Sequence, residues 1–306
     1  MLKKFLLSII TALACMTATA DNNVRVWFAA AGGPMEAMCR KIWANYETYF
    51  KEDTAVIVQA GLDGILSIRS LQADTSKNKV LCHGSSVWVQ NQFVHSDTDI
   101  GTSDLIPLFK YSDEPTVFYT PNTNKSQSLD EMMKNFRGLN RPINVAVFTG
   151  VHRALAQYLE KKYSVDLNIV SYKRGPDFYS GLVDGSVDLA FDAGGAVGVA
   201  RTGRFRIIGY GSLKDDENLL DQRNFYKDNR ELEKFAMWLG LSIPKSSSPE
   251  FRELVTKRVE FILAQPDFQQ FAIKNYAPVA PLKDKALVQF IDNQVKATAQ
   301  IWKKVK

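Results

Sequence analysis

Short β-rich apolar runs alternate with segments of helical periodicity along most of the chain. The run Val24–Ala30 precedes the amphipathic segment Met35–Phe50, and the strands expected at Ala55–Val58 and Val80–Cys82 flank a helix that begins after Gly64. This βαβαβ order is typical of parallel strands joined by right-handed crossovers. The sequence therefore predicts an α/β fold.

A second series of alternating elements begins near residues 116–120, which suits two domains in a chain of 306 residues. The segment Lys214–Arg230 is charged and weakly periodic, so we expect it to be a mobile surface segment. The strands expected in this half are Ile143–Phe148, Asn168–Tyr172, Val187–Phe191, Phe205–Tyr210 and Phe235–Ile243. The helices expected are Leu129–Phe136, His152–Tyr163, Asp177–Val183, Pro249–Ala264, Pro266–Asn275 and Lys283–Lys304.

Residues 1–20 have the pattern of an export signal. Lys3 and Lys4 precede the apolar run Phe5–Ala14, and Ala18–Ala20 offers a cleavage site between small residues. The run is too short to span a bilayer, and the alternative is a buried first helix. Cys15 is a second alternative, as a lipid anchor, but it lacks the leucine usual three residues before such a cysteine. We expect a soluble, exported mature protein.

Charge and cysteine content exclude several classes of function. Loss of the two signal lysines lowers the net charge from +5 to +3, and the positive residues are scattered, which is not a nucleic-acid footprint. Cys39 and Cys82 then remain, and they could form a disulfide in an oxidising compartment or stay as two buried thiols. Histidines and cysteines are few and lack paired ligand spacing, so we expect no metal and no cofactor.

The loops that follow the predicted strands are rich in glycine and hydroxyl groups. They include Gly32-Gly33, Gly84–Ser86, Thr149-Gly150 and Gly194-Gly195. Ligands of open α/β sheets bind beyond the C-terminal ends of the strands. Helix N-termini at such positions favour an anion, and glycine lets the backbone approach it. The loops predict an anion site.

At these loops the chain resembles the substrate-binding proteins of tripartite tricarboxylate transporters, the Bug family, over nearly the whole mature sequence. No single motif is specific, but six occur in the family's order. They are Phe28–Pro34, Gly84–Ser86, Thr149–His152, Tyr172–Gly175, Gly185–Asp192 and Ile301–Val305.

The resemblance implies a two-lobed periplasmic-binding-protein fold, the type II Venus flytrap, and a periplasmic location. Lobe 1 is expected to comprise residues 21–120 and 232–306, and lobe 2 residues 121–231, with hinges near Val117–Pro121 and Phe235–Ile243. The implied ligand is a small carboxylate held between the lobes. The implied partner of a monomeric binding protein is a membrane permease of the tripartite type.

Four departures from the family pattern lie in the expected cleft. Met35-Glu36 replaces an expected aspartate, Ala60–Gly64 replaces a Pro-Gly-Ala-Gly-Gly loop, Arg174 replaces glycine, and Gly150-Val151 replaces Ser-Pro. Asp63, in the second of these, and Arg174 are candidates for a charged ligand contact or for solvated surface charges.

The candidate ligand-binding residues follow from the loops and the resemblance together. Asp192 is also a candidate helix cap, His152 a candidate capping or packing residue, and Tyr172 candidate half-buried core. The full set of candidates is Phe28, Ala31, Gly32, Gly33, Ser85, Ser86, Thr149, Gly150, His152, Tyr172 and Asp192.

Two other functions remain as alternatives. An exported enzyme could use the adjacent Cys82 and His83, but neighbours on a strand point to opposite faces. The chain has no Gly-x-Ser-x-Gly elbow, His-Glu-x-x-His helix or Walker A loop, so we expect no enzyme activity. A periplasmic sensor that presents its closed form to a receptor kinase is indistinguishable from a transport protein by sequence.

Overall fold

The computed structural model describes residues 23–29, 32–172 and 176–305. The expected export signal, Cys15, Ala31 and Arg174 lie outside these residues. Within the described ranges, no helix is both long and apolar enough to cross a membrane.

Six strands form the sheet of lobe 1, in the order β11-β4-β10-β3-β1-β2. β1 runs parallel to β2 and β3, whereas β10 is antiparallel to β3 and β4, and β11 is antiparallel to β4. The strands are β1 (Val24–Phe28), β2 (Thr54–Val58), β3 (Lys79–Gly84), β4 (Leu105–Glu114), β10 (Met237–Pro244) and β11 (Val279–Lys283). The longer helices of this lobe are α2 (Gly33–Phe50), α3 (Ile65–Ala73), α10 (Pro249–Leu263) and α11 (Pro266–Lys274).

Five strands form the sheet of lobe 2, in the order β7-β6-β8-β5-β9. β6 is parallel to β7 and β8, and β5 is antiparallel to β8 and β9. The strands are β5 (Thr116–Thr120), β6 (Ile143–Val147), β7 (Leu167–Ser171), β8 (Leu189–Asp192) and β9 (Arg206–Gly211). The helices are α5 (Leu129–Arg137), α6 (Gly150–Tyr163), α7 (Pro176–Asp184) and α8 (Val197–Arg201).

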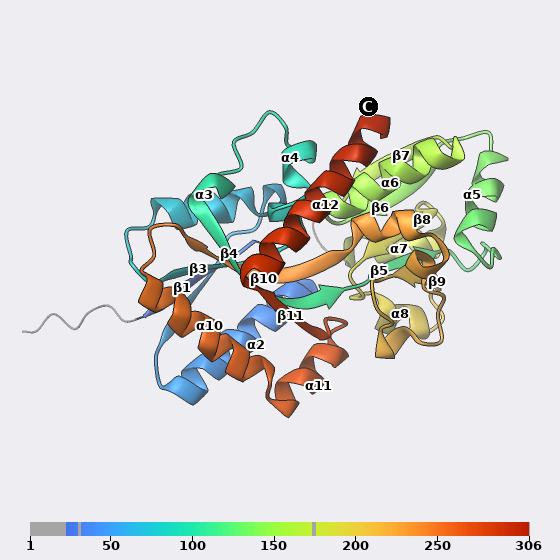
Figure 1. Ribbon diagram of the computed structural model, residues 1–306. Helices are drawn as coiled ribbons and strands as arrows, with labels where there is room; N and C mark the ends of the chain where they lie inside the picture. The colour runs from blue at the N-terminus through green and yellow to red at the C-terminus, as the bar shows by residue number, and fades with distance from the viewer. Residues whose placement is uncertain (1–22, 30–31, 173–175, 306) are drawn as a thin grey trace, which may run out of the picture.

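The chain crosses between the lobes twice, and Figure 1 shows the two groups of elements side by side. The first crossing is at Pro115, between β4 and β5, so β5 belongs to the second sheet although we had expected lobe 1 to reach residue 120. The return runs through the short helix η5 (Arg230–Phe235) into β10. The last helix, α12 (Asp284–Val305), contacts β4 and β11 of lobe 1 and also α6 of lobe 2.

The segment Lys214–Arg230 differs from our expectation of a mobile surface stretch. It contains the short helices η4 (Glu217–Leu219) and α9 (Phe225–Asp228). Phe225 and Tyr226 are buried in the core of lobe 2. A Cβ at Gly211 would lie 2.1 Å from the Tyr226 ring, so this glycine provides the space into which the tyrosine packs.

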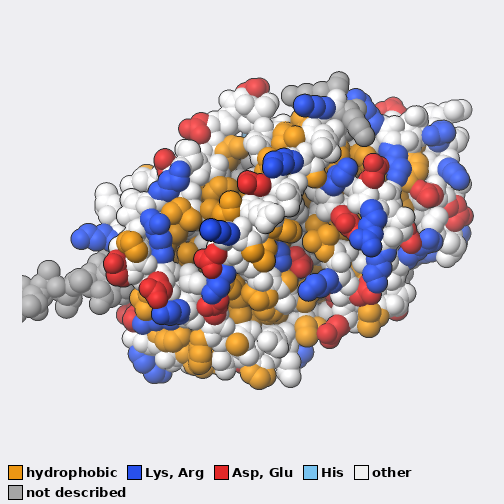
Figure 2. Space-filling model, in the orientation of Figure 1, with side chains coloured by type: hydrophobic (Ala, Val, Ile, Leu, Met, Phe, Trp, Pro, Cys, Tyr) orange, Lys and Arg blue, Asp and Glu red, His pale blue; other side chains and the backbone are white. Residues whose placement is uncertain are grey.

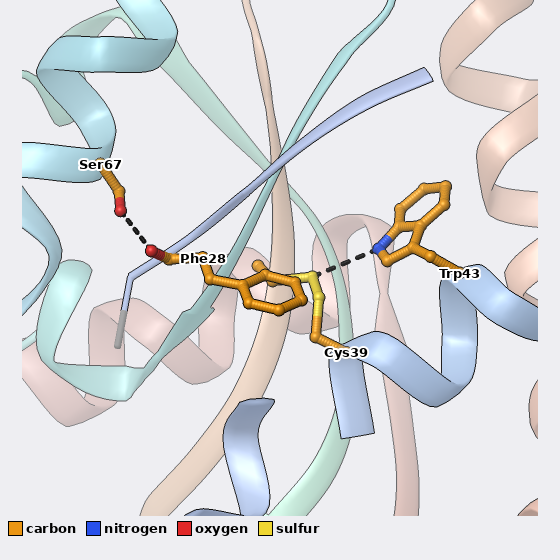
Figure 3. Close-up of a disulfide and its surroundings, with 5 residues drawn as sticks. Phe28, Cys39, Trp43 and Ser67 are labelled. Atoms are coloured by element: carbon orange, nitrogen blue, oxygen red, sulfur yellow. Dashed lines mark hydrogen bonds between the residues drawn. A yellow bond between two sulfur atoms is a disulfide. The ribbon is translucent and has the colours of Figure 1, made fainter. Parts of the chain in front are cut away.

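A disulfide between Cys39 and Cys82 ties α2 to β3 inside lobe 1. It settles the choice between a disulfide and two thiols that the sequence leaves open. The Trp43 indole N–H donates to the Cys82 sulfur over 3.4 Å. Figure 3 shows this hydrogen bond and the Phe28 ring beside the disulfide. All four residues belong to the hydrophobic core of the lobe. The disulfide thus ties β3, which ends at the Gly84–Ser86 turn, to the helix that follows β1.

Four further short helices lie in the loops of lobe 1: η1 (Leu62–Gly64), η2 (Ser85–Val87), α4 (Asn91–Val94) and η3 (Thr102–Asp104). Both η2 and α4 contact α6 of lobe 2. On the face shown in Figure 2, acidic and basic side chains are interspersed rather than gathered by sign.

Candidate ligand-binding site

A small cavity of about 80 Å³ lies where the strand-end loops of both lobes meet. Lobe 1 lines it with the loop after β1, with Asp63, and with the turn after β3; lobe 2 lines it with the loops after β6 and β8. Glu114 and Met237, at the two crossings, complete the lining. Hollows of about 510 and 520 Å³ lie elsewhere on the surface, but no strand-end glycine loops converge on them.

Gly32 and Gly33 form the start of α2 at the edge of this cavity. Their φ angles are +80° and +72°, a conformation that L side chains rarely adopt, and a Cβ on either would meet open space. The Gly32 N–H donates to the Glu36 carboxylate over 2.6 Å. This hydrogen bond, helped by Arg40, holds the pKa of Glu36 below its usual value. The Glu36 side chain therefore already uses one of the backbone donors that we predicted for a ligand.

Thr149 and Gly150 form the start of α6 on the opposite side of the cavity. The Thr149 hydroxyl oxygen caps the helix by accepting from the His152 N–H over 3.3 Å. The Gly150 N–H donates to the Asp63 carboxylate over 3.0 Å, and Asp63 belongs to lobe 1. Asp63 is thus neither a free ligand contact nor a solvated surface charge: it binds the other lobe.

Ser85 and Ser86 are buried and line the cavity between the two helix starts. They follow β3, whose position is fixed by the Cys39–Cys82 disulfide. Within the part of the chain that the structure describes, neither hydroxyl is engaged in a hydrogen bond. Both hydroxyls are therefore available to a ligand.

Glu114 is a cavity residue that the sequence analysis missed. The residue is 7% exposed, and its side chain makes no hydrogen bond or ion pair within the described ranges. Burial, with a smaller contribution from the Asp192 charge, raises the pKa of Glu114 to about 8. At neutral pH most of this carboxyl group is therefore protonated and is a hydrogen-bond donor. The available signal was an acidic residue directly before Pro115, at the end of a strand.

Five of the predicted ligand-binding residues lie outside the cavity lining, and Gly150, whose N–H is taken by Asp63, is one of them. Phe28 is in the lobe 1 core and Tyr172 packs on Phe178, with ring centroids 6.1 Å apart. His152 is a fully buried residue of the first turn of α6, and burial lowers its pKa to about 3. Asp192 accepts from the Tyr119 hydroxyl and from the Gly194 and Ala196 N–H groups of the loop before α8, whose N-cap residue is Ala196.

The hypothesis of a Cys82 nucleophile loses its chemical basis, because Cys82 is bonded to Cys39 and has no free thiol. His83 instead lies beside Ser242, with 2.8 Å between the His83 Nε2 atom and the Ser242 hydroxyl oxygen. Burial lowers the pKa of His83 to about 4. Among the described residues, no group of three His, Cys, Asp or Glu side chains could hold a metal ion.

No family model and no curated protein matches the sequence, but solved structures match the fold. The periplasmic binding protein BugD is 20% identical, with a TM-score of 0.78 over 92% of this chain and 97% of its own. The adipate-bound Rpa4515 protein of R. palustris is 13% identical, with a TM-score of 0.82 over 92% and 97%. Malate-bound MatC of Rhodopseudomonas palustris is 16% identical, with a TM-score of 0.78 over 92% and 99%.

These likenesses define the class: the chain has the two-lobed α/β fold of periplasmic solute-binding proteins. The predicted resemblance to tripartite tricarboxylate-type binding proteins is confirmed at the level of the fold, over about 92% of the chain.

Proposed function

We propose that this chain is an exported solute-binding protein that captures a small carboxylate between its lobes. The observation that carries the proposal is the cavity at which strand-end loops of both sheets converge, with two helix N-termini and two serine hydroxyls that have no hydrogen-bond partner among the described residues. Ligands of open α/β sheets bind at such positions. Adipate and malate, the ligands of two proteins with this fold, supply the chemical class.

Uncharged hydrogen-bond donors are proposed to hold the carboxylate. The Ser85, Ser86 and Thr149 hydroxyls line the cavity, as does Gly33, whose backbone is exposed to it. Protonated Glu114 adds an O–H donor at neutral pH, as protonated carboxylic acids in apolar sites do. The cavity needs no lysine or arginine to bind an anion, because hydrogen bonds in a site shielded from water are strong.

Capture proceeds by closure of the lobes. A solute that contacts both lobes stabilises the closed form by its differential affinity for that form. The crossings at Pro115 and at the start of β10 are the proposed hinges. The first segment of lobe 1 accordingly ends at Pro115 and not at residue 120 as expected from the sequence. Because α12 contacts both lobes, its last turns shift their packing during opening.

Delivery to the permease of a tripartite tricarboxylate transporter is proposed from the fold resemblance to BugD and a TctC solute-binding protein. The export signal proposed in residues 1–20 would carry the mature protein out of the cytoplasm, where it can meet the outward face of such a permease. A receptor that recognises the same closed form is the alternative partner, and uptake by a permease-containing membrane distinguishes the two.

A thermal-shift screen of residues 21–306 against mono-, di- and tricarboxylates tests the proposal. A ligand at a hundredfold excess over its dissociation constant stabilises the folded state by about 2.7 kcal/mol. Gly33→Phe should abolish the shift by filling the cavity. Gly185→Phe is the matched control, because Gly185 has a similar φ of +81° and equally open space but lies outside the cavity. A shift that survives Gly33→Phe would place the ligand elsewhere.

A further inference from the structure

Asp63 reaches from lobe 1 to the first turn of an opposing helix. Its Oδ1 accepts from the Gly150 N–H of α6 over 3.0 Å. Its Oδ2 lies 3.0 Å from Nε2 of His95, which is also in lobe 1. A carboxylate at a helix N-terminus is stabilised by the free N–H groups and by the helix dipole. The protein's own side chain therefore occupies the anion position of α6.

The backbone around Asp63 is built to present this carboxylate. Leu62 and Asp63 have φ angles of +47° and +52°, and Gly61 and Gly64 on either side also have positive φ. Residues other than Gly, Asn and Asp seldom adopt this left-handed backbone conformation, which costs roughly 1–3 kcal/mol per residue. The Asn91 side chain donates to the Asp63 carbonyl oxygen over 3.1 Å and holds the turn in place.

Lobe 2 is shaped to receive the same carboxylate. A Cβ at Gly150 would lie 3.1 Å from Asp63 Oδ2 and 3.4 Å from its Cγ, closer than most Cβ contacts. The backbone conformation at position 150 does not require a glycine, since its φ is not positive. The loop around Asp63 and the residues 150–151 are two of the places where the chain departs from the family it resembles, and here those two places touch.

We propose that the Asp63 carboxylate is an internal ligand, which holds the two lobes closed in the absence of solute and competes with a solute carboxylate at the start of α6. The closure does not depend on the function proposed above; the competition rests on it. A solute must then displace Asp63 or bind beside it through the serine hydroxyls, so apparent affinity is reduced by the population of the self-closed form.

Distance measurements without any solute test the closure. Spin labels at Lys77→Cys in lobe 1 and Lys134→Cys in lobe 2 report lobe separation by double electron–electron resonance, and both positions are exposed. We expect one short distance in the parent and a longer, broader distribution in Asp63→Gly, because glycine keeps the left-handed turn while removing the carboxylate. Asp97→Gly, which removes an exposed acid of the same lobe, is the control and should not change the distance.

Sodium formate then tests the competition, with sodium chloride at equal ionic strength as its control. Formate should shorten the distance and raise the melting temperature of Asp63→Gly but not of the parent. The best carboxylate from the thermal-shift screen should bind Asp63→Gly about tenfold more tightly, within the usual range of coupling between sites. Asp63→Asn keeps the shape and local geometry and should open partly, because a neutral amide oxygen accepts a weaker hydrogen bond.

An open distribution in the parent that is identical in Asp63→Gly would overturn the inference, and it would leave carboxylate binding untouched. Equal effects of formate on both proteins would overturn the competition. A different result is a parent protein that binds no carboxylate and is closed, together with an open Asp63→Gly variant. That result would support closure by Asp63 and would contradict the function proposed above. The two proposals therefore fail on different measurements.

Discussion

Glu114 carries a buried carboxyl group that lines the cavity at the first crossing between the lobes. Burial and the Asp192 charge raise its pKa to about 8. Between the ordinary pKa and 8, the folded state holds a proton that the unfolded state has released. The free energy of unfolding therefore falls as pH rises through this window, by about 1.4 kcal/mol per unit at most.

Glu114→Gln should flatten this dependence, because glutamine keeps the polar shape and does not titrate. We expect the variant to gain stability relative to the parent as pH rises from 5 to 8, measured by urea unfolding at several pH values. Affinity for a carboxylate should also fall above about pH 8 in the parent, where Glu114 becomes charged, and not in the variant. The same pH profile in both proteins would show that Glu114 is ionised throughout.

His152 has the opposite effect on stability. Burial lowers its pKa to about 3, and neither ring nitrogen has a hydrogen-bond partner among the described residues. The unfolded state binds a proton below pH 6.5 that the folded state excludes, so the free energy of unfolding falls as pH falls towards 3.

His152→Leu should remove this acid sensitivity. At pH 5 we expect the variant to exceed the parent by about 2 kcal/mol, relative to the difference between them at pH 8. The Thr149 cap is preserved, since the hydroxyl accepts from a backbone N–H. Urea unfolding at both pH values measures the effect. A difference that does not change between pH 5 and pH 8 would assign the acid sensitivity to other groups.

Single residues also show where sequence reasoning ends. The positions of Gly32, Gly33, Ser85, Ser86 and Thr149 in the cavity lining were predicted, because strand ends meet at one edge of a sheet. The partners of Glu36 and Asp63 were not predictable in the same way. Each acid binds a backbone N–H that only the folded loop, or the opposite lobe, brings within reach.

At the scale of elements, α2 and β3 are joined by a disulfide whose cysteines are 43 residues apart. Removing both with Cys39→Ala and Cys82→Ala should lower the free energy of unfolding by about 4 kcal/mol for a closed loop of this length. The Ala29 N–H donates to the Cys82 carbonyl, so we also expect weaker ligand binding through the loop after β1. Urea unfolding and calorimetry measure these effects, and an unchanged unfolding midpoint would contradict the assignment.

Elements with a strong apolar period were predicted well, and α2, α5, α6, α10, α11 and α12 begin and end within a few residues of the predicted bounds. Strands β4 and β11 were missed because neither follows the strand–helix alternation that guided the prediction. The segment Lys214–Arg230 was misread because its charge outweighed two aromatic residues. Phe225 and Tyr226 pack where Gly209 and Gly211 of β9 leave space, a match between distant positions that local composition does not show.

The whole molecule consists of two α/β lobes joined at two crossings and spanned by α12. The discontinuous lobe 1 was predicted only through the family resemblance, since composition does not reveal which later strand returns to an earlier sheet. The end of α12 packs on the core of lobe 2, with Ile301 buried there, although it had been expected in lobe 1. The proposed motion of the lobes would therefore change the packing of this helix.

Calorimetric titration of residues 21–306 with the carboxylate panel tests the central claim most directly. We predict that at least one small acid binds with a stoichiometry of one per chain. Gly33→Phe should abolish the heat of binding, whereas Gly185→Phe should leave it unchanged. Absence of binding by every acid in the panel, or binding that Gly33→Phe does not affect, would contradict the assignment of the interlobe cavity as a carboxylate site.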